Sequence, residues 1–346
     1  MRRSTAPALA ALGALLLTAP AVAQDLPGTD AGNHRTRRTE TQPFAPPTFR
    51  RDDAEFRVGT LAQAFARVPL ERAAQADVFS VPRARLALRA TLAGRFGAYV
   101  RAELAGQPAL LDAEVTARVA PALRLRAGRF KTPFSYEFTE VTSGTDFADR
   151  ARVVRALVPG RRVGIEALVG GGARPIELLA GVFNARGLDG AGARGRLLGV
   201  GRVAVHLPTS FVEATGVRGA FGANVAAEDG PLPADTAVVA GRTLAGVDGR
   251  VRMGRVVVAA EWLREYARRA PADDRTGYYV TAGYDISLDH RVLARLDRFA
   301  GSSDLVLGYN TSLHPAVTAL VNVVVPLNDR AGSRRAGLVI GTQVAF

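Results

Sequence analysis

The chain has 346 residues, with 45 lysines and arginines against 32 aspartates and glutamates, and its formal net charge is +13. Hydrophobic residues make up 48% of the sequence, too large a share for a disordered basic tail. Cysteine is absent, which excludes a disulfide framework, thiolate metal sites and a cysteine nucleophile. So strong a positive charge usually indicates nucleic acid or another anionic surface as the partner.

Residues 1–23 have the organisation of a secretory signal peptide. A positive start at Arg2 and Arg3 precedes an apolar run over 6–19, and a small-x-small cleavage pattern ends at Ala23. The apolar run is shorter than the roughly 20 residues that a transmembrane helix needs. We therefore expect export with cleavage near Ala23, and this expectation excludes nucleic acid as a partner.

The remaining chain divides into two parts. Residues 24–54 are polar and contain prolines and a cluster of arginines, which predicts a flexible segment with no fold of its own. In residues 55–346, polar and apolar residues alternate instead of recurring at helical spacing. Leu86 and Leu88, for example, share one face of a segment whose opposite face carries Arg85.

This alternation predicts sixteen strands in one all-β domain over residues 55–346. The predicted strands cover residues 55–67, 80–92, 95–105, 110–119, 122–131, 162–170, 175–184, 196–207, 212–226, 243–253, 254–266, 276–286, 290–299, 303–312, 315–325 and 335–346.

The connections between these strands alternate between long and short. The long ones cover residues 68–79, 132–161, 185–195, 227–242 and 267–275. A periplasmic β-sandwich, the alternative interpretation, has no reason to alternate its connections in this way. A transmembrane antiparallel β-barrel does, because its turns are short on one side of the outer membrane and its loops are long on the other. Its apolar face then meets lipid, and its polar face meets a water-filled lumen.

Aromatic residues support a barrel in the outer membrane. The apolar faces of two neighbouring predicted strands carry Tyr278, Tyr284 and Trp262. These side chains suit the aromatic girdles that outer-membrane barrels have at the two membrane interfaces. The last predicted strand ends on Phe346, and a terminal strand of this kind resembles the signal read by the outer-membrane assembly machinery.

Several blocks resemble the phosphate-selective porin O and P family. The most specific is Gly128-Arg129-Phe130-Lys131-Thr132-Pro133-Phe134, which is similar to the family's G-x-F-K-x-P-F segment. Further blocks lie at residues 82–88, 149–164, 294–297 and 341–346. The resemblance implies a sixteen-stranded barrel, usually a homotrimer, with an anion-selective pore and inorganic anions, phosphate first, as the transported partners.

Two sets of cations are candidates for binding the anion. The longest connection, 132–161, stands where porins have a loop that folds inward and narrows the channel. The constriction candidates in and beside it are Lys131, Arg150, Arg152, Arg155, Arg161 and Arg162. A second set, the lumen ladder, consists of arginines on the polar strand faces. Its members are Arg83, Arg85, Arg89, Arg101, Arg124, Arg126, Arg202, Arg218 and Arg250.

Arginine suits this role because its rigid fork of donors matches phosphate oxygens and keeps its charge. The alternative is that these arginines are solvated or paired with carboxylates as ordinary lumen lining. Strict alternation even places Arg129 and Lys131 on the outer face; either a bulge re-aims them or they reach the lipid headgroups.

Other chemistry finds little support in the sequence. A G-x-G-x-x-G match at 190–195 lies in a predicted outer loop without strand–helix context. The histidines have no ligand spacing, and we expect neither a metal nor a cofactor. The aspartates at 52–53 and 273–274 are interpreted as solvated loop charges, with extracellular calcium as the alternative. Besides an anion-selective porin, the open alternatives are a weakly selective porin for small hydrophilic solutes and a barrel enzyme or non-conducting anchor.

Overall fold

The computed structural model describes residues 47–70, 78–140, 142–171, 174–185, 196–229, 241–267, 275–328 and 336–346. The predicted signal peptide, most of the segment 24–54 and the G-x-G-x-x-G match at 190–195 lie outside the described residues. Asp273 and Asp274 lie outside them as well.

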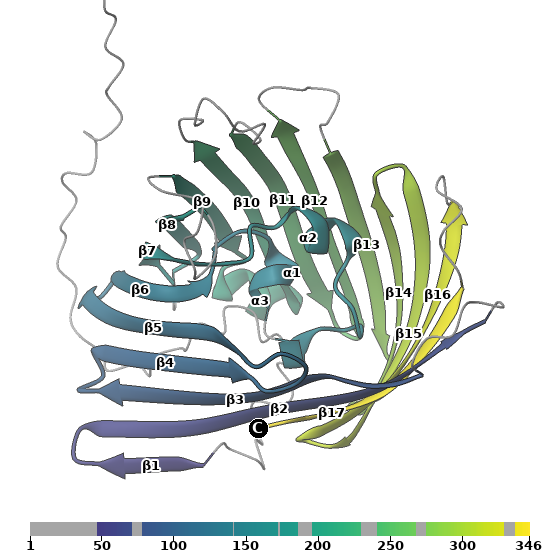
Figure 1. Ribbon diagram of the computed structural model, residues 1–346, viewed down its shortest axis with the longest axis horizontal. Helices are drawn as coiled ribbons and strands as arrows, with labels where there is room; N and C mark the ends of the chain where they lie inside the picture. Colours follow the sequence, from purple (N-terminus) through teal and green to yellow (C-terminus); the bar gives the residue numbers. More distant parts are fainter. Residues whose placement is uncertain are drawn as a thin grey trace, which may run out of the picture.

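The described residues contain seventeen strands, sixteen of which close into an antiparallel barrel (Figure 1). The strands are β1 (Thr48–Arg51), β2 (Ala54–Pro69), β3 (Phe79–Leu92), β4 (Phe96–Glu103), β5 (Ala109–Ala120), β6 (Leu123–Lys131), β7 (Arg161–Gly170), β8 (Ile176–Asn184), β9 (Leu197–His206), β10 (Val217–Asp229), β11 (Arg242–Met253), β12 (Val256–Ala267), β13 (Arg275–Asp285), β14 (His290–Phe299), β15 (Ser302–His314), β16 (Val317–Asn328) and β17 (Gly337–Ala345). The helices are α1 (Tyr136–Thr139), the 3-10 turn η1 (Thr142–Gly144), α2 (Arg152–Leu157) and α3 (Thr209–Thr215).

The barrel closes where the first long strand meets the last. Strand β2 pairs with β3 along one edge and with β17 along the other, where Phe65 stands opposite Gly341. Strands β9 and β10 also pair directly, so neighbours in the chain are neighbours in the barrel throughout. Closure gives each barrel strand a hydrogen-bonding partner on both sides, which an open sheet in lipid would lack.

The prediction of a sixteen-stranded antiparallel barrel is confirmed, with two local differences. The ninth strand begins at Val217 instead of residue 212, because the chain first forms helix α3. Gly216 ends this helix with φ at 70°, the left-handed conformation that favours glycine. In addition, residues 48–51, predicted to be flexible, form β1 and pair with the start of β2.

Burial in the barrel strands is inverted relative to a soluble protein. Large apolar side chains such as Ile165, Val182 and Phe221 are exposed on the outside, whereas carboxylates such as Asp297 are buried inside. Trp262 stands opposite Tyr278 on neighbouring strands, whereas Tyr284 lies farther along β13 opposite Val256, so the expected aromatic side chains lie at two levels of the barrel. This arrangement fits a barrel whose outer face meets hydrocarbon. No helix among the described residues is long and apolar enough to cross a membrane.

The described part of the connection between β6 and β7, residues 132–140 and 142–160, lies inside the ring of strands (Figure 1). We call this connection the inner segment. Its apolar side chains Phe134, Val154 and Leu157 are buried in a cluster with residues of the barrel wall. Further along the segment, Phe147 packs on β14 and β15, and Ala148 packs on β2, β16 and β17. Apolar packing therefore fixes the segment to much of the wall's circumference.

We expect Ile165→Arg to lower the free energy of unfolding by about 2–4 kcal/mol, because Ile165 lies at the middle of β7 and is 63% exposed on the apolar face. Urea unfolding in lipid vesicles measures this change. As a control, Leu313→Arg near a strand end should cost only about 0–1 kcal/mol. Equal costs at the two positions would contradict a lipid-facing exterior.

Candidate functional site

Hydrogen bonds fix the first half of the inner segment to the wall formed by β10–β12. The Ser135 hydroxyl donates to Glu261 Oε2 at 3.1 Å, and the Ser135 amide donates to Asn224 Oδ1 at 3.4 Å. Ser135 also caps α1 by accepting a hydrogen bond from the Phe138 amide. A buried loop needs such partners for its backbone, since no water replaces them.

The second half of the inner segment is fixed to strands farther around the barrel. The Arg152 amide donates to Asp297 Oδ2 at 2.8 Å, and the Ala148 amide donates to Asn322 Oδ1 at 2.8 Å. Asp149 forms an ion pair with Arg67 of β2, with 2.8 Å between Nη1 and Oδ2. The segment therefore reaches from β10 past β16 to β2.

Two cations bind carbonyl oxygens of the inner segment. The Lys131 ammonium donates to the Glu140 carbonyl at 2.7 Å and to the Thr139 carbonyl at 3.3 Å. The Arg150 guanidinium donates to the Glu137 carbonyl at 3.0 Å and to the Glu140 carbonyl at 3.2 Å. A carbonyl oxygen orients a cation and satisfies its donors, but it carries no net charge to cancel it.

Strands β2–β4 and β7 add further cations beside Lys131 and Arg150. We call the group the cation wall: Arg67, Arg83, Arg85, Arg101, Lys131, Arg150 and Arg161. Three carboxylates form ion pairs with it: Glu103 with Arg85, Asp112 with Arg101 and Arg161, and Asp149 with Arg67. Counting these three carboxylates together with the nearby Glu137 and Glu140, seven basic side chains outnumber five acidic ones at this wall.

The pKa values of groups in the inner segment reflect burial among these charges. Burial lowers the pKa of Arg150 to about 10, and the positive charges of Arg83 and Arg161 lower it too, while Glu137 opposes them. Burial raises the pKa of Glu140 to about 7, against the favourable charge of Arg250. Burial would also raise the pKa of Asp149, but its hydrogen bond to Arg67 holds that pKa below the ordinary value.

The structure brings together three of the six constriction candidates, namely Lys131, Arg150 and Arg161. Arg152 instead donates to the Ser302 carbonyl at 3.2 Å, and Arg162 donates to the Arg161 carbonyl. Arg155 is exposed on α2, and its side chain forms no hydrogen bond or ion pair within the described part of the chain.

Lys131 does not behave as strict alternation predicts. The register between β6 and β7 is continuous through Lys131, so no bulge re-aims its side chain there. Lys131 is the last residue of β6, and from that position its ammonium reaches the carbonyl oxygens of the inner segment. Arg129 instead donates to the carbonyls of Leu110 and Leu111 on β5.

The lumen ladder divides into two groups. Five of its members form ion pairs: Arg85, Arg101, Arg126, Arg202 and Arg250. The other four form none within the described residues: Arg83, Arg89, Arg124 and Arg218. Of these, Arg83 donates to Gln63 Oε1 at 2.6 Å, and Arg89 stacks over the Tyr99 ring at 4.8 Å. Both interactions order a guanidinium without cancelling its charge.

Sequence reasoning missed Arg67, Asp112 and Tyr99 as members of this site. Asp112 and Tyr99 lie on the polar faces of their predicted strands, which was a usable signal. The partners of Asp112, however, come from β4 and β7, and only the barrel brings them together. Within the described residues, no group of three or more His, Asp or Glu side chains could hold a metal ion.

Comparison with known proteins identifies the kind of barrel. A family model described as phosphate-selective porin O and P matches residues 59–299. The chain superposes on an anion-selective porin from Comamonas acidovorans with a TM-score of 0.63 at 13% identity, covering 85% of this chain and 100% of that one. It superposes on the channel DcaP of Acinetobacter baumannii with a TM-score of 0.61 at 12% identity, covering 86% and 99%. OmpT of Vibrio cholerae, in a trimer form, gives 0.60 at 9% identity, covering 85% and 100%. A search of curated protein sequences finds no match.

We expect the inner segment to be held less firmly as the pH rises from about 4.5 to about 7. The pKa of Glu140 is raised above its unfolded value of 4.5, so the docked segment favours the protonated acid, and the stability that this contributes is lost as the pH passes about 7. The loss is on the order of 3 kcal/mol. Hydrogen exchange of amides in 142–158, corrected for the intrinsic pH dependence of exchange, measures it. Glu140→Gln should remove most of this dependence, and an unchanged dependence in that variant would contradict the assignment.

Proposed function

The chain belongs to the phosphate-selective porin O and P family, and we propose that small anions, phosphate above all, diffuse passively through this outer-membrane porin in preference to cations. The observation that carries the proposal is the cation wall with its seven cations and three paired carboxylates. The family and the fold indicate a channel rather than an enzyme.

We propose that the inner segment forms the constriction of the channel. An anion that enters a narrow passage loses part of its hydration, and positive groups must replace it. Lys131 and Arg150, fixed by backbone carbonyls, would stand ready without having to leave a carboxylate partner. Conduction also needs several weak sites in series, because one tight site would hold the ion. The ladder arginines without ion pairs, such as Arg83 and Arg89, would supply the further sites.

A weakly selective porin for small hydrophilic solutes is the second candidate. It is favoured by the ion pairs of the lumen, because Arg126 between Glu114 and Glu166, and Arg202 with Asp248, are largely neutralised. The two candidates differ in the sign and size of the reversal potential under a salt gradient.

We propose that the protein is exported and assembles as a trimer in the bacterial outer membrane, as the sequence indicates. The chain would pass the inner membrane with cleavage near Ala23, and Phe346 would take part in recognition by the assembly machinery. A homotrimer in outer-membrane lipid is supported by the family and by the trimer form of OmpT among the similar structures.

We expect planar bilayers containing the porin to show chloride-favouring reversal potentials and to be blocked by millimolar phosphate. The double variant Arg83→Gln/Arg155→Gln should bring the reversal potential closer to zero and weaken the block several-fold, because it removes two positive charges near Asp149 without leaving a new buried carboxylate. Arg95→Gln, at an exposed turn residue outside the lumen set, is the matched control. Cation-favouring potentials in the unmodified porin would contradict anion selectivity.

A further inference from the structure

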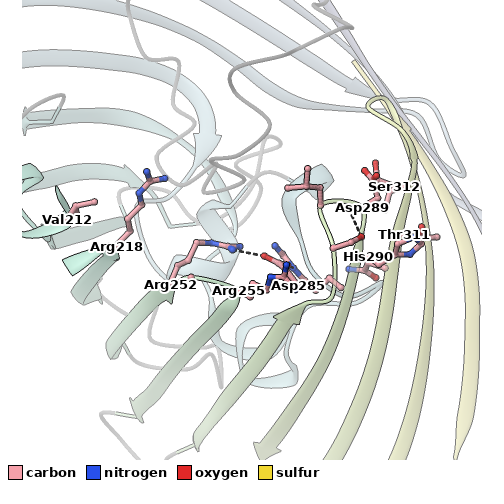
Figure 2. A pocket seen from close by; sticks show the side chains of 16 residues that line it. Val212, Arg218, Arg252, Arg255, Asp285, Asp289, His290, Thr311 and Ser312 are labelled. Carbon is pink, nitrogen blue, oxygen red and sulfur yellow. Dashed lines mark hydrogen bonds and ion pairs between the residues drawn. The ribbon is translucent and has the colours of Figure 1, made fainter. Parts of the chain in front are cut away.

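A second polar site lies away from the inner segment's cation wall, at the end of the barrel where the strand connections are short. It is a pocket of about 330 Å³ between β10–β11 on one side and β15–β16 on the other (Figure 2). Figure 2 shows Arg218 and Arg252 at one side of this pocket and Thr311 and Ser312 at the other, with Asp285 between them. The lining is thus cationic at one end and rich in hydroxyl groups at the other.

The cationic end has too few carboxylates for its arginines. Arg218 and Arg252 stand directly opposite each other on β10 and β11, and like charges in such a pair repel. Arg252 forms an ion pair with Asp285 at 2.6 Å, and Arg291 shares the same carboxylate at 2.5 Å while also pairing with Asp146 at 2.9 Å. The Arg218 side chain is exposed and forms no ion pair among the described residues. A bound anion at this end would relieve the repulsion.

The other end offers groups that bind hydroxyls. Asn310 stands opposite Arg291, and Ser312 stands opposite Thr318, so these side chains gather on neighbouring strands. The Asn310 amide nitrogen donates to the Asp146 carbonyl at 2.7 Å, which fixes the orientation of the side chain. Its oxygen Oδ1 is buried and has no hydrogen-bond partner among the residues that the structure describes. A buried acceptor without a donor is costly, and a hydroxyl of a ligand would satisfy it.

We propose that this pocket binds the phosphate monoester of a polyol, such as a sugar phosphate, with the phosphoryl group at Arg218 and Arg252 and the hydroxyls at Asn310 and Thr318. The inference rests on the proposed anion-selective function and extends it to a class of substrate. Guanidinium forks match phosphoryl oxygens, while Asn and Thr exchange hydrogen bonds with hydroxyls. A volume of about 330 Å³ lies at the small end of ligand sites. Inorganic phosphate, with one phosphorus and four oxygens, would leave most of it unfilled.

The test is the block of chloride current by glucose 6-phosphate and by inorganic phosphate, each added to both compartments of a planar bilayer. In the unmodified porin, the ester should block at a concentration about tenfold lower than phosphate does. Arg218→Gln should raise the blocking concentration of the ester about tenfold, because it removes a charge-assisted hydrogen bond. Thr318→Val should weaken the block by the ester several-fold and leave the block by phosphate unchanged.

Arg95→Gln, an exposed arginine in the turn between β3 and β4 outside the pocket, serves as the matched control and should change neither block. Equal block by the ester and by phosphate in the unmodified porin would overturn the inference, and so would an Arg218→Gln variant that conducts normally and is blocked by the ester as before. These failures are distinct from failure of the proposed function, which would appear as the absence of chloride preference in the unmodified porin.

Discussion

The arrangement of charge in this barrel depends on how the buried backbone of the inner segment satisfies its hydrogen bonds. Its amides donate to side chains of the barrel wall: the Arg152 amide donates to Asp297, and the Ala148 amide donates to Asn322. Its carbonyls at residues 137, 139 and 140 instead accept from Lys131 and Arg150. Because peptide groups carry dipoles and no net charge, this exchange orders Lys131 and Arg150 without an ion pair among the described residues.

The same docking occupies acids of the barrel wall. Glu261 and Asp297 lie on the wall that the inner segment covers, and each is almost completely buried. Glu261 accepts from the Ser135 hydroxyl and Asp297 from the Arg152 amide, so both serve to hold the segment. The cations of β2–β4 and β7 have fewer acids among them. An excess of one sign along a narrow, partly dehydrated passage raises the local concentration of the opposite ion.

Much of the fold follows from the sequence alone, because alternation with a period of two is local. The bounds of β3, β14 and most other barrel strands lie within a few residues of the prediction, and the alternating connection lengths indicated the antiparallel closed order. Local exceptions could not be predicted in this way. The residues of helix α3 before Gly216 include apolar side chains that also suit a strand.

The site was only partly predictable, because its contacts join residues that are distant in the chain. Ser135 and Glu261, or Arg67 and Asp149, meet only because the barrel closes and the inner segment docks. Sequence position gave Arg150 and Arg161 as members of one cluster, but it could not separate them from Arg152 and Arg162, which bond elsewhere. Nor could it tell paired from unpaired ladder arginines, since Arg126 and Arg124 occupy equivalent positions on the polar face of β6.

Crystals of the porin soaked in bromide test the central claim most directly, because anomalous scattering locates the anion itself. The account predicts bromide peaks beside Arg83, Lys131 and Arg150, on the side of the lumen that the cation wall forms. Bromide absent from that wall, or gathered only at the ion-paired Arg126 and Arg202, would contradict it.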